Sequence, residues 1–421
     1  MNQALYRHCV CTLEKELLPA MGCTEPISVA LAAAIAKRTL GSLPDRVFIT
    51  VSGNILKNVK SVVVPNTGGL RGVTAAAAAG IVIGDPEREL EVLSGATEQD
   101  FEKIKTYLTQ AEFSVEETTS GCVFDIGVRV FHGEDEAYVR IEGHHTNVIR
   151  IERNGESILK EEIANEECAE CDPLSVADIY EFATTADLTE IKPLLARQLT
   201  FNLKIAEEGL QNDYGANVGK TLLAAFGDNA HNRARAYAAA GSDARMNGCS
   251  LPVVIVSGSG NQGMTASLPV YVYAKHLGAT EEKLYRALAL SDLVTVHLKS
   301  GIGRLSAYCG AVSAGCGAAA GVCYLHGGSL EEIEDTVVNA VAIDSGIVCD
   351  GAKSSCAAKI ASAVDAGLVG FELARKGKRF YGGDGIIETE IEQTIRNVGE
   401  LASKGMRQTD EEIIRLMIKS K

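Results

Sequence analysis

Five cysteines in the last third of the chain are spaced in a way that could hold an iron–sulfur cluster. Cys309, Cys316 and Cys323 recur at intervals of seven in an apolar stretch that predicts a helix. Seven helical residues rise about 10.5 Å, so at most one of these thiols is expected to bind a small cluster. Cys349 and Cys356 are separated by six residues in a Gly/Ser-rich turn. One helical and two turn cysteines would supply three thiolates, and because clusters usually take four, one iron would stay open. Small buried packing cysteines are the alternative.

A second candidate is the turn MGCTEP at residues 21–26, which precedes an apolar stretch that predicts a buried helix. Thr24 is the predicted N-cap, and Glu25 suits the positive helix end. Cys23 would then lie beside unpaired backbone N–H groups, which can lower a thiol pKa from about 8.5. A nearby Glu25 carboxylate would oppose this effect. A buried cysteine at a helix cap, without chemistry, is the alternative.

Two glycine-rich turns could present backbone N–H groups to an anion. One is VSGSGNQGM at 256–264 and the other is VPNTGG at 64–69. The first lacks the features of a phosphate-binding loop or a dinucleotide fingerprint, so a small carboxylate is the expected ligand. Ordinary turns at helix starts are the alternative. The candidate substrate-binding residues are Asn66, Thr67, Gly68, Ser257, Gly258, Ser259, Gly260, Asn261, Gln262 and Gly263.

Two further pairs receive no role from the sequence. His144 and His145 are adjacent within a predicted strand, where neighbouring side chains point to opposite faces and cannot easily share a metal. Cys168 and Cys171 form one CxxC among glutamates. With no second CxxC to complete a zinc ribbon, a surface loop is expected there.

Composition limits the classes of function. The 421 residues carry a net charge of −15, and no basic stripe with interleaved aromatics is present, so nucleic acid is not an expected partner. No apolar run is long enough to span a membrane, and the first residues lack the apolar run of a signal peptide. We expect a cytoplasmic protein with 12 reduced cysteines and a small-molecule ligand. A homo-oligomer is compatible with these features.

The hydrophobic periodicity predicts an α+β protein, with an N-terminal α/β-sheet domain and a larger, mostly α-helical cluster-binding domain. RVFITVSGNI and KSVVVP read as strands, and the single helices 215–240 and 304–324 are among those expected later in the chain. The expected domains are residues 1–43 (N-terminal helices packing on the catalytic domain), 44–170 (α+β) and 171–421 (helical, iron–sulfur, catalytic).

Five motifs in order resemble those of the iron–sulfur L-cysteine desulfidases, a family related to the α subunit of iron–sulfur L-serine dehydratases. They are MGCTEP, VPNTGG, GSGNQG, the YCG helix and CDGAKSSC, and the resemblance runs from about residue 15 to 403. It implies a [4Fe-4S] cluster held by Cys309, Cys349 and Cys356. It also implies that Cys23 is the proton acceptor.

The implied activity is a carbon–sulfur lyase that converts L-cysteine to pyruvate, ammonia and hydrogen sulfide. The open iron would act as a Lewis acid on the substrate sulfur, and Cys23 would remove the Cα proton. An iron–sulfur L-serine or L-threonine dehydratase is the alternative enzyme. A non-catalytic amino-acid or iron–sulfur sensor is the alternative from another class.

Overall fold

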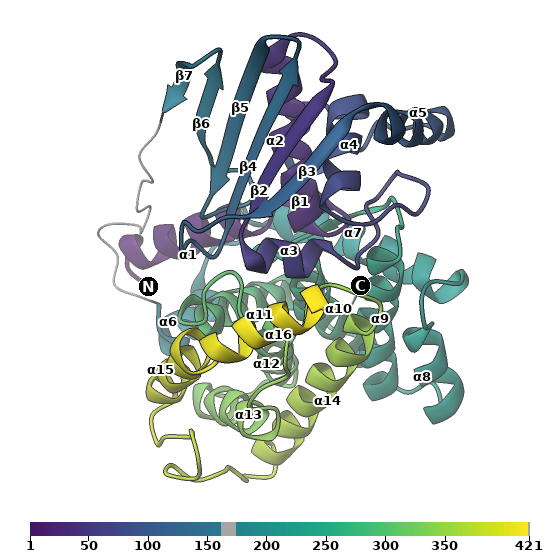
Figure 1. The fold of residues 1–421 in the computed structure, drawn as a ribbon. Coiled ribbons are helices and arrows are strands. Elements are labelled where there is room, and N and C mark those ends of the chain that lie inside the picture. Colours follow the sequence, from purple (N-terminus) through teal and green to yellow (C-terminus); the bar gives the residue numbers. More distant parts are fainter. Residues whose placement is uncertain (161–173, 420–421) are drawn as a thin grey trace.

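Two hydrophobic cores organise the chain. The computed structural model describes residues 1–160 and 174–419. One core lies between a six-stranded sheet and two apolar helices, and the other lies among the helices below that sheet (Figure 1). The predicted α+β class, with a sheet-containing N-terminal part and a larger helical part, is therefore confirmed.

The sheet has the strand order β3-β2-β4-β5-β6-β7, in which only the β2–β3 pair is parallel. Its strands are β2 (Arg46–Val51), β3 (Glu112–Glu117), β4 (Asp125–His132), β5 (Asp135–Glu142), β6 (Val148–Arg153) and β7 (Glu156–Lys160). The helices α2 (Thr24–Leu40) and α4 (Val73–Ile83) share the core of this sheet, and α5 (Glu98–Gln110) packs against α4. A short 3-10 helix, η1 (Pro86–Glu91), follows α4.

Small residues let α2 and α4 approach closely. Fourteen of the 17 residues of α2 are buried, and most are Ala, Val, Ile or Leu. A Cβ at Gly80 of α4 would lie 2.1 Å from the Ala30 carbonyl oxygen, so only glycine fits at this crossing. The close contact fixes the direction of α2, and hence the position of its N-terminus.

The second core is formed by helices around α12 (Gly310–Leu325), which packs against α10, α11, α13 and α14. The surrounding elements are α1 (Gln3–Glu16), α6 (Val176–Thr185), α7 (Lys192–Gln211), α8 (Val218–Phe226), α9 (Ala230–Met246), α10 (Gly260–Leu277), α11 (Glu281–Ser300), α13 (Leu330–Ile343), α14 (Cys356–Ala374), α15 (Ile391–Glu400), the π-helical η2 (Leu401–Gly405) and α16 (Arg407–Lys419). None of the helices in the described part of the chain has the length and apolar character that crossing a membrane requires.

Three predicted elements are wrong in extent. The strand RVFITVSGNI ends at Val51, because the Ser52 side chain accepts a hydrogen bond from the Ile55 amide and starts α3 (Gly53–Val59). The next predicted strand, KSVVVP, contributes only an isolated bridge between Val63 and Arg71. The expected helix 215–240 is divided into α8 and α9 by Gly227, whose φ of 82° is unfavourable for other residues.

The N-terminal segment divides between the two cores. Helix α1 packs with α6 and α11, whereas α2 packs on the sheet. The predicted grouping of residues 1–43 on the catalytic domain therefore does not describe α2. The other domain boundaries stay predictions, and the one at 170/171 lies outside the described residues.

Candidate active site

A short strand pair brings two of the sequence motifs together. Strand β1 (Pro19–Met21) pairs antiparallel with β8 (Pro252–Val254). The pair holds the two segments together, and beyond it the Thr24 hydroxyl donates to the Gly258 carbonyl at 3.0 Å. MGCTEP and GSGNQG, more than 230 residues apart, thus form one structural unit.

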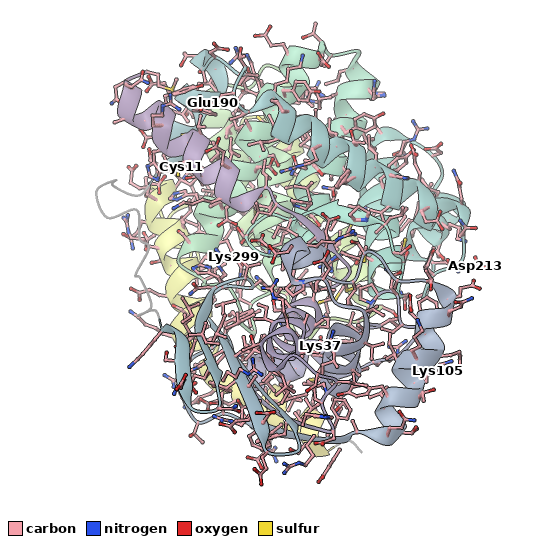
Figure 2. All side chains as sticks on the ribbon, turned by 90° about the horizontal axis from the view of Figure 1, so that it is seen from above. Cys11, Lys37, Lys105, Glu190, Asp213 and Lys299 are labelled. Atoms are coloured by element: carbon pink, nitrogen blue, oxygen red, sulfur yellow. The ribbon has the colours of Figure 1, made fainter. Side chains whose placement is uncertain are left out.

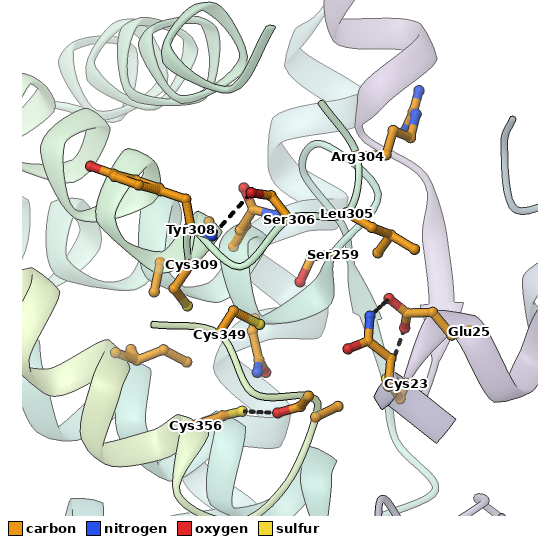
Figure 3. Close-up of a pocket in the computed structure, with 18 of the residues that line it drawn as sticks. Cys23, Glu25, Ser259, Arg304, Leu305, Ser306, Tyr308, Cys309, Cys349 and Cys356 are labelled. Atoms are coloured by element: carbon orange, nitrogen blue, oxygen red, sulfur yellow. Dashed lines mark hydrogen bonds between the residues drawn. The ribbon is translucent and has the colours of Figure 1, made fainter. Parts of the chain in front are cut away.

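A cavity of about 100 Å³ lies next to this unit. Cys309, Cys349 and Cys356 line one side of it, and Cys23 and Glu25 lie across from them (Figure 3). The structure therefore brings together the four cysteines to which the sequence assigned roles.

The three cysteines on one side come from separate segments. Cys309 is the N-cap of α12, Cys356 is the first residue of α14, and Cys349 lies in the loop between α13 and α14. The predicted helix 304–324 is wrong at its start, because Cys309 pairs through its amide with the Ile347 carbonyl at 2.9 Å. Cys316 is buried inside α12 and is not among the residues that line the cavity.

Four helices begin at the cavity: α2, α10, α12 and α14 each contribute residues of their first two turns to its wall. Helix N-termini carry partial positive charge and unpaired N–H groups, which favour anionic ligands. A thiolate-bound cluster and an amino-acid carboxylate are both anionic, so the cavity suits either.

The Cys349 and Cys309 thiols form a hydrogen-bonded pair. That hydrogen bond, together with the Lys57 ammonium, lowers the pKa of Cys349, whereas the same pairing and burial raise the pKa of Cys309. Lys57 itself is buried; it is ion-paired with Asp410 of α16 and donates to the Cys349 carbonyl at 3.4 Å. These surroundings favour the thiolate at Cys349 and the thiol at Cys309.

Cys23 does not have the environment that the sequence predicts. It is itself the N-cap of α2 in place of Thr24, and its Sγ donates to the Glu25 carboxylate at 3.0 Å. Burial and the negative charge of Glu25 raise the thiol pKa, so the predicted lowering is wrong. Glu25 is held in place by the Asn58 amide, which donates to its other oxygen at 3.0 Å. Burial would raise the Glu25 pKa, but His145, the Cys23 thiol and Arg245 together bring it below its usual value.

Cationic side chains at the cavity were missed by the sequence reasoning. Lys299 of α11 lies near the middle of the molecule in Figure 2, far from the rim where Lys105 and Asp213 lie, and is only 5% exposed. Burial lowers its pKa to about 8, and the charges that act against this are those of Cys349 and Cys309. Arg245 of α9 also lines the cavity and is 2% exposed. The sequence could have indicated Arg245, because it is a charged residue at the end of the largely apolar stretch AAAGSDARM.

The predicted anion-binding turns fare differently. Ser259, Asn261 and Gln262 line the cavity, and the rest of that turn supports them: Gly263, for example, packs directly on the Val254 carbonyl. Ser257 and Gly258, both with positive φ, make the bend, and Gly260 opens α10.

The turn at 66–68 does not line the cavity. Asn66 donates to the Leu93 carbonyl at 2.9 Å, Thr67 donates to the Val64 carbonyl at 2.7 Å, and Gly68 lies against Phe101. The polar side chains of this turn are engaged in hydrogen bonds that hold the loop before α4. The structure does not bring them to the cavity, and their role in binding substrate stays a prediction.

The adjacent histidines lie in the connection between β5 and β6, so the predicted strand at this point is wrong. His145 is buried with its ring edge-to-face on Phe124, whereas His144 is exposed. Burial lowers the pKa of His145 to about 4. Cys168 and Cys171 lie outside the described residues.

Within residues 1–160 and 174–419, no three His, Cys, Asp or Glu side chains are arranged around a point that could hold one metal ion. The Cys309 and Cys349 thiols contact each other, and the Cys356 Sγ lies 3.8 Å from the Gly351 carbonyl oxygen. A [4Fe-4S] cluster takes each thiolate on a different iron, so its ligands need not surround a single point. Three thiols around one cavity are the donor set that such a cluster uses.

Comparison with known proteins identifies the family. The sequence profile described as "Serine dehydratase alpha chain" matches residues 87–415. The chain belongs to the serine dehydratase alpha chain family. The matched residues include Arg245 and all three cysteines at one side of the cavity, while Cys23 precedes them.

Relatives match this family member over 96–100% of its length. A UPF0597 protein of Desulfitobacterium hafniense is 51% identical over 96% of this chain and 95% of its own length. A UPF0597 protein of Lachnoclostridium phytofermentans is 50% identical over 98% of this chain and 100% of its own length. A third, from Treponema denticola, is 42% identical over 100% and 99%, respectively.

Proposed function

We propose that this member of the serine dehydratase alpha chain family is an L-cysteine desulfidase, a lyase that forms pyruvate, ammonia and hydrogen sulfide. The observation that carries the proposal is the convergence of Cys309, Cys349 and Cys356 on one buried cavity, opposite Cys23. The family supports a lyase, since dehydratases are lyases. The motif resemblance to the desulfidases favours cysteine as the substrate.

A [4Fe-4S] cluster fits the residues present. Cys309, Cys349 and Cys356 would hold it, and the family is typically iron–sulfur dependent. Lys299 supports this assignment, because it is a buried cation on which the charges of Cys349 and Cys309 act favourably. When bound, the cluster supplies an open iron as a Lewis acid for the leaving sulfur.

The chain's own residues would carry the proton transfer. Cys23 Sγ passes its proton to the hydrogen-bonded Glu25 oxygen, and the resulting thiolate accepts the proton from the substrate Cα. The pair of electrons from that C–H bond forms the Cα–Cβ double bond as sulfide leaves. The aminoacrylate product then tautomerises and is hydrolysed in water to pyruvate and ammonia.

The wall of the cavity bears on the choice between cysteine and serine. Leu305, Ala352 and Ile360 give it apolar surface, against which a thiol packs as a small hydrophobe. A buried substrate hydroxyl would need hydrogen-bond partners instead. The family description nevertheless names serine, so an L-serine (or L-threonine) dehydratase with the same cluster is the second candidate.

The test is turnover by anaerobically purified protein, with iron quantified in the same sample. We expect sulfide release from L-cysteine to exceed pyruvate formation from L-serine or L-threonine. Broad visible absorbance should be lost in Cys349→Ala and Cys356→Ala but kept in Cys316→Ala, the matched buried control. Faster serine turnover would select the dehydratase. A colourless, fully active protein would exclude the cluster, and tight cysteine binding without turnover would point to a sensor.

A further inference from the structure

The cavity contains a buried guanidinium that no carboxylate of the described residues neutralises by an ion pair. Arg245 is 2% exposed, and its Nη1 donates to the Asn261 side-chain oxygen at 3.1 Å. Its Nε is buried with no partner. Glu25 acts on it through space, but the two do not form an ion pair. A buried charge without a partner is costly, so this position indicates an anionic ligand.

The protein is built to place this group. A Cβ at Gly260 would lie 2.5 Å from Arg245 Nε and 2.9 Å from Cζ, so the guanidinium rests on the glycine that opens α10. The Ser259 side chain makes no capping hydrogen bond, and the first intrahelical hydrogen bond is that of the Gly263 amide. The first-turn N–H groups of α10 are therefore available beside the guanidinium.

A third group adjoins the same point. The Gln262 side chain is buried, its Oε1 has no partner, and it lies against Gly310, the residue after Cys309. Gln262 thus connects the Arg245 side of the cavity with the cysteine side. In Figure 3 the Ser259 hydroxyl lies between the three cysteines and Glu25.

We propose that Arg245, together with the N-terminus of α10, binds the carboxylate of the amino-acid substrate and selects for it. Arginine presents two parallel N–H groups that match a carboxylate, and such pairs are strong when buried. This inference rests on the proposed function, since it assigns the substrate's anchor in the same cavity. Among the residues that line the cavity, Lys299 is also a buried cation, but the opposite charges that act on it are those of Cys349 and Cys309, which lie on the cluster side.

The test uses ligand pairs that differ only in the carboxylate. Wild-type holoenzyme should use L-cysteine with a kcat/KM at least about 100-fold above that for L-cysteinamide, because the amide lacks the negative charge. Calorimetry should show 3-mercaptopropionate, which lacks the α-amino group, binding at least about 30-fold more tightly than 3-mercaptopropionamide. Arg245→Gln should reduce both ratios to below about 5-fold, and Arg245→Lys should give intermediate values.

Arg235→Gln is the matched control. Arg235 lies on the same helix and also has a buried Nε without a partner, but it is ion-paired with Asp365 and does not line the cavity. Both ratios should stay at the wild-type value in this variant. The Cβ added in Gly260→Ala would push the Arg245 guanidinium away from α10, so this variant should also lower both ratios.

Ratios kept by Arg245→Gln would overturn the anchor, even if sulfide is released. If Arg245→Gln fails to fold, Arg245→Lys and Gly260→Ala test the anchor instead. Unchanged ratios in both variants would overturn the assignment of Arg245. Preference for the acid that depends on Arg245, in a protein that releases no sulfide from cysteine, would leave the anchor standing and reject the desulfidase.

Discussion

The hydrogen bond between Cys23 and Glu25 gives a quantitative prediction for Glu25→Gln. The carboxylate lies 3.0 Å from Sγ, and the glutamine is nearly isosteric but uncharged. Removing the negative charge should favour the Cys23 thiolate, because the charge repulsion that raises the thiol pKa disappears while burial remains.

The size of the effect follows from Coulomb's law. Two unit charges about 3 Å apart interact by about 5 kcal/mol at an effective dielectric constant near 20. Each 1.4 kcal/mol corresponds to a factor of ten, so the thiolate fraction could rise by up to about 10³–10⁴. Nucleophilicity falls with thiol pKa, with a Brønsted coefficient of about 0.4–0.5. The net expectation is about 100-fold faster alkylation of Cys23.

The assay is iodoacetamide labelling of the apoprotein at pH 7.5, followed by quantification of the peptide that contains Cys23. Cys9 serves as the internal control, because it is fully buried in the core among the helices and its labelling reports global opening. Its labelling should be the same in wild type and Glu25→Gln. In the holoenzyme, the rise of kcat/KM with pH should move to lower pH in the variant.

Equal or slower labelling of Cys23 in Glu25→Gln, with Cys9 unchanged, would refute this reasoning. It would mean that the negative charge of Glu25 does not raise the pKa of the Cys23 thiol. Faster labelling of both cysteines would show instead that the variant has opened, and Glu25→Asp would then be compared, since it keeps the charge.

Three further predictions concern stability. Asp292 of α11 is fully buried beside Gln198, and burial raises its pKa from 3.8 to about 8. The protein therefore loses stability as the pH rises through that range. Asp292→Asn should be more stable than wild type by up to about 4 kcal/mol at pH 7, or about 5 °C in Tm, and this difference should vanish near pH 4. The pH dependence that His145 gives to stability has the opposite sign. Burial lowers the pKa of His145 from 6.5 to about 4, so stability falls as the pH drops through that range. His145→Gln should remove about 3 kcal/mol of this loss, measured by denaturant unfolding between pH 4 and 7. Gly80→Ala should cost about 3 kcal/mol by pushing α2 from α4, whereas Gly95→Ala, whose added Cβ meets only an Arg88 side-chain nitrogen at 4.0 Å, should be neutral by the same assay.

Sequence patterns carried the parts of the structure that depend on local periodicity. The start of strand β2 and most of helix α12 follow directly from the spacing of apolar residues. Cys23 and the cluster cysteines could be selected because they stand in motifs. That these cysteines share one cavity is a tertiary fact, set by the β1–β8 pair and by the loop before α14.

The errors arose where capping chemistry or burial outweighed the pattern. Ser52 turned an apparent strand into α3, and the position of Cys309 before α12 was hidden by the apolar residues around it. The environment of Cys23 depended on a carboxylate two residues away, whose direction no pattern shows. Arg245 and Lys299 carried no motif, and only their burial distinguishes them from surface cations.

The buried ammonium of Lys299 links the cofactor to the lifetime of the protein. With the proposed cluster in place, its charge is balanced by the thiolates of Cys309 and Cys349. Without the cluster, the Cys309 thiol, whose pKa is raised, keeps its proton, and part of that balance is lost while the ammonium stays buried. A group that binds only the native state stabilises it by mass action, so the loaded protein should unfold less often than the empty one. Oxidative loss of the cluster would therefore end more than catalysis: it would expose the damaged chain to unfolding and proteolytic clearance.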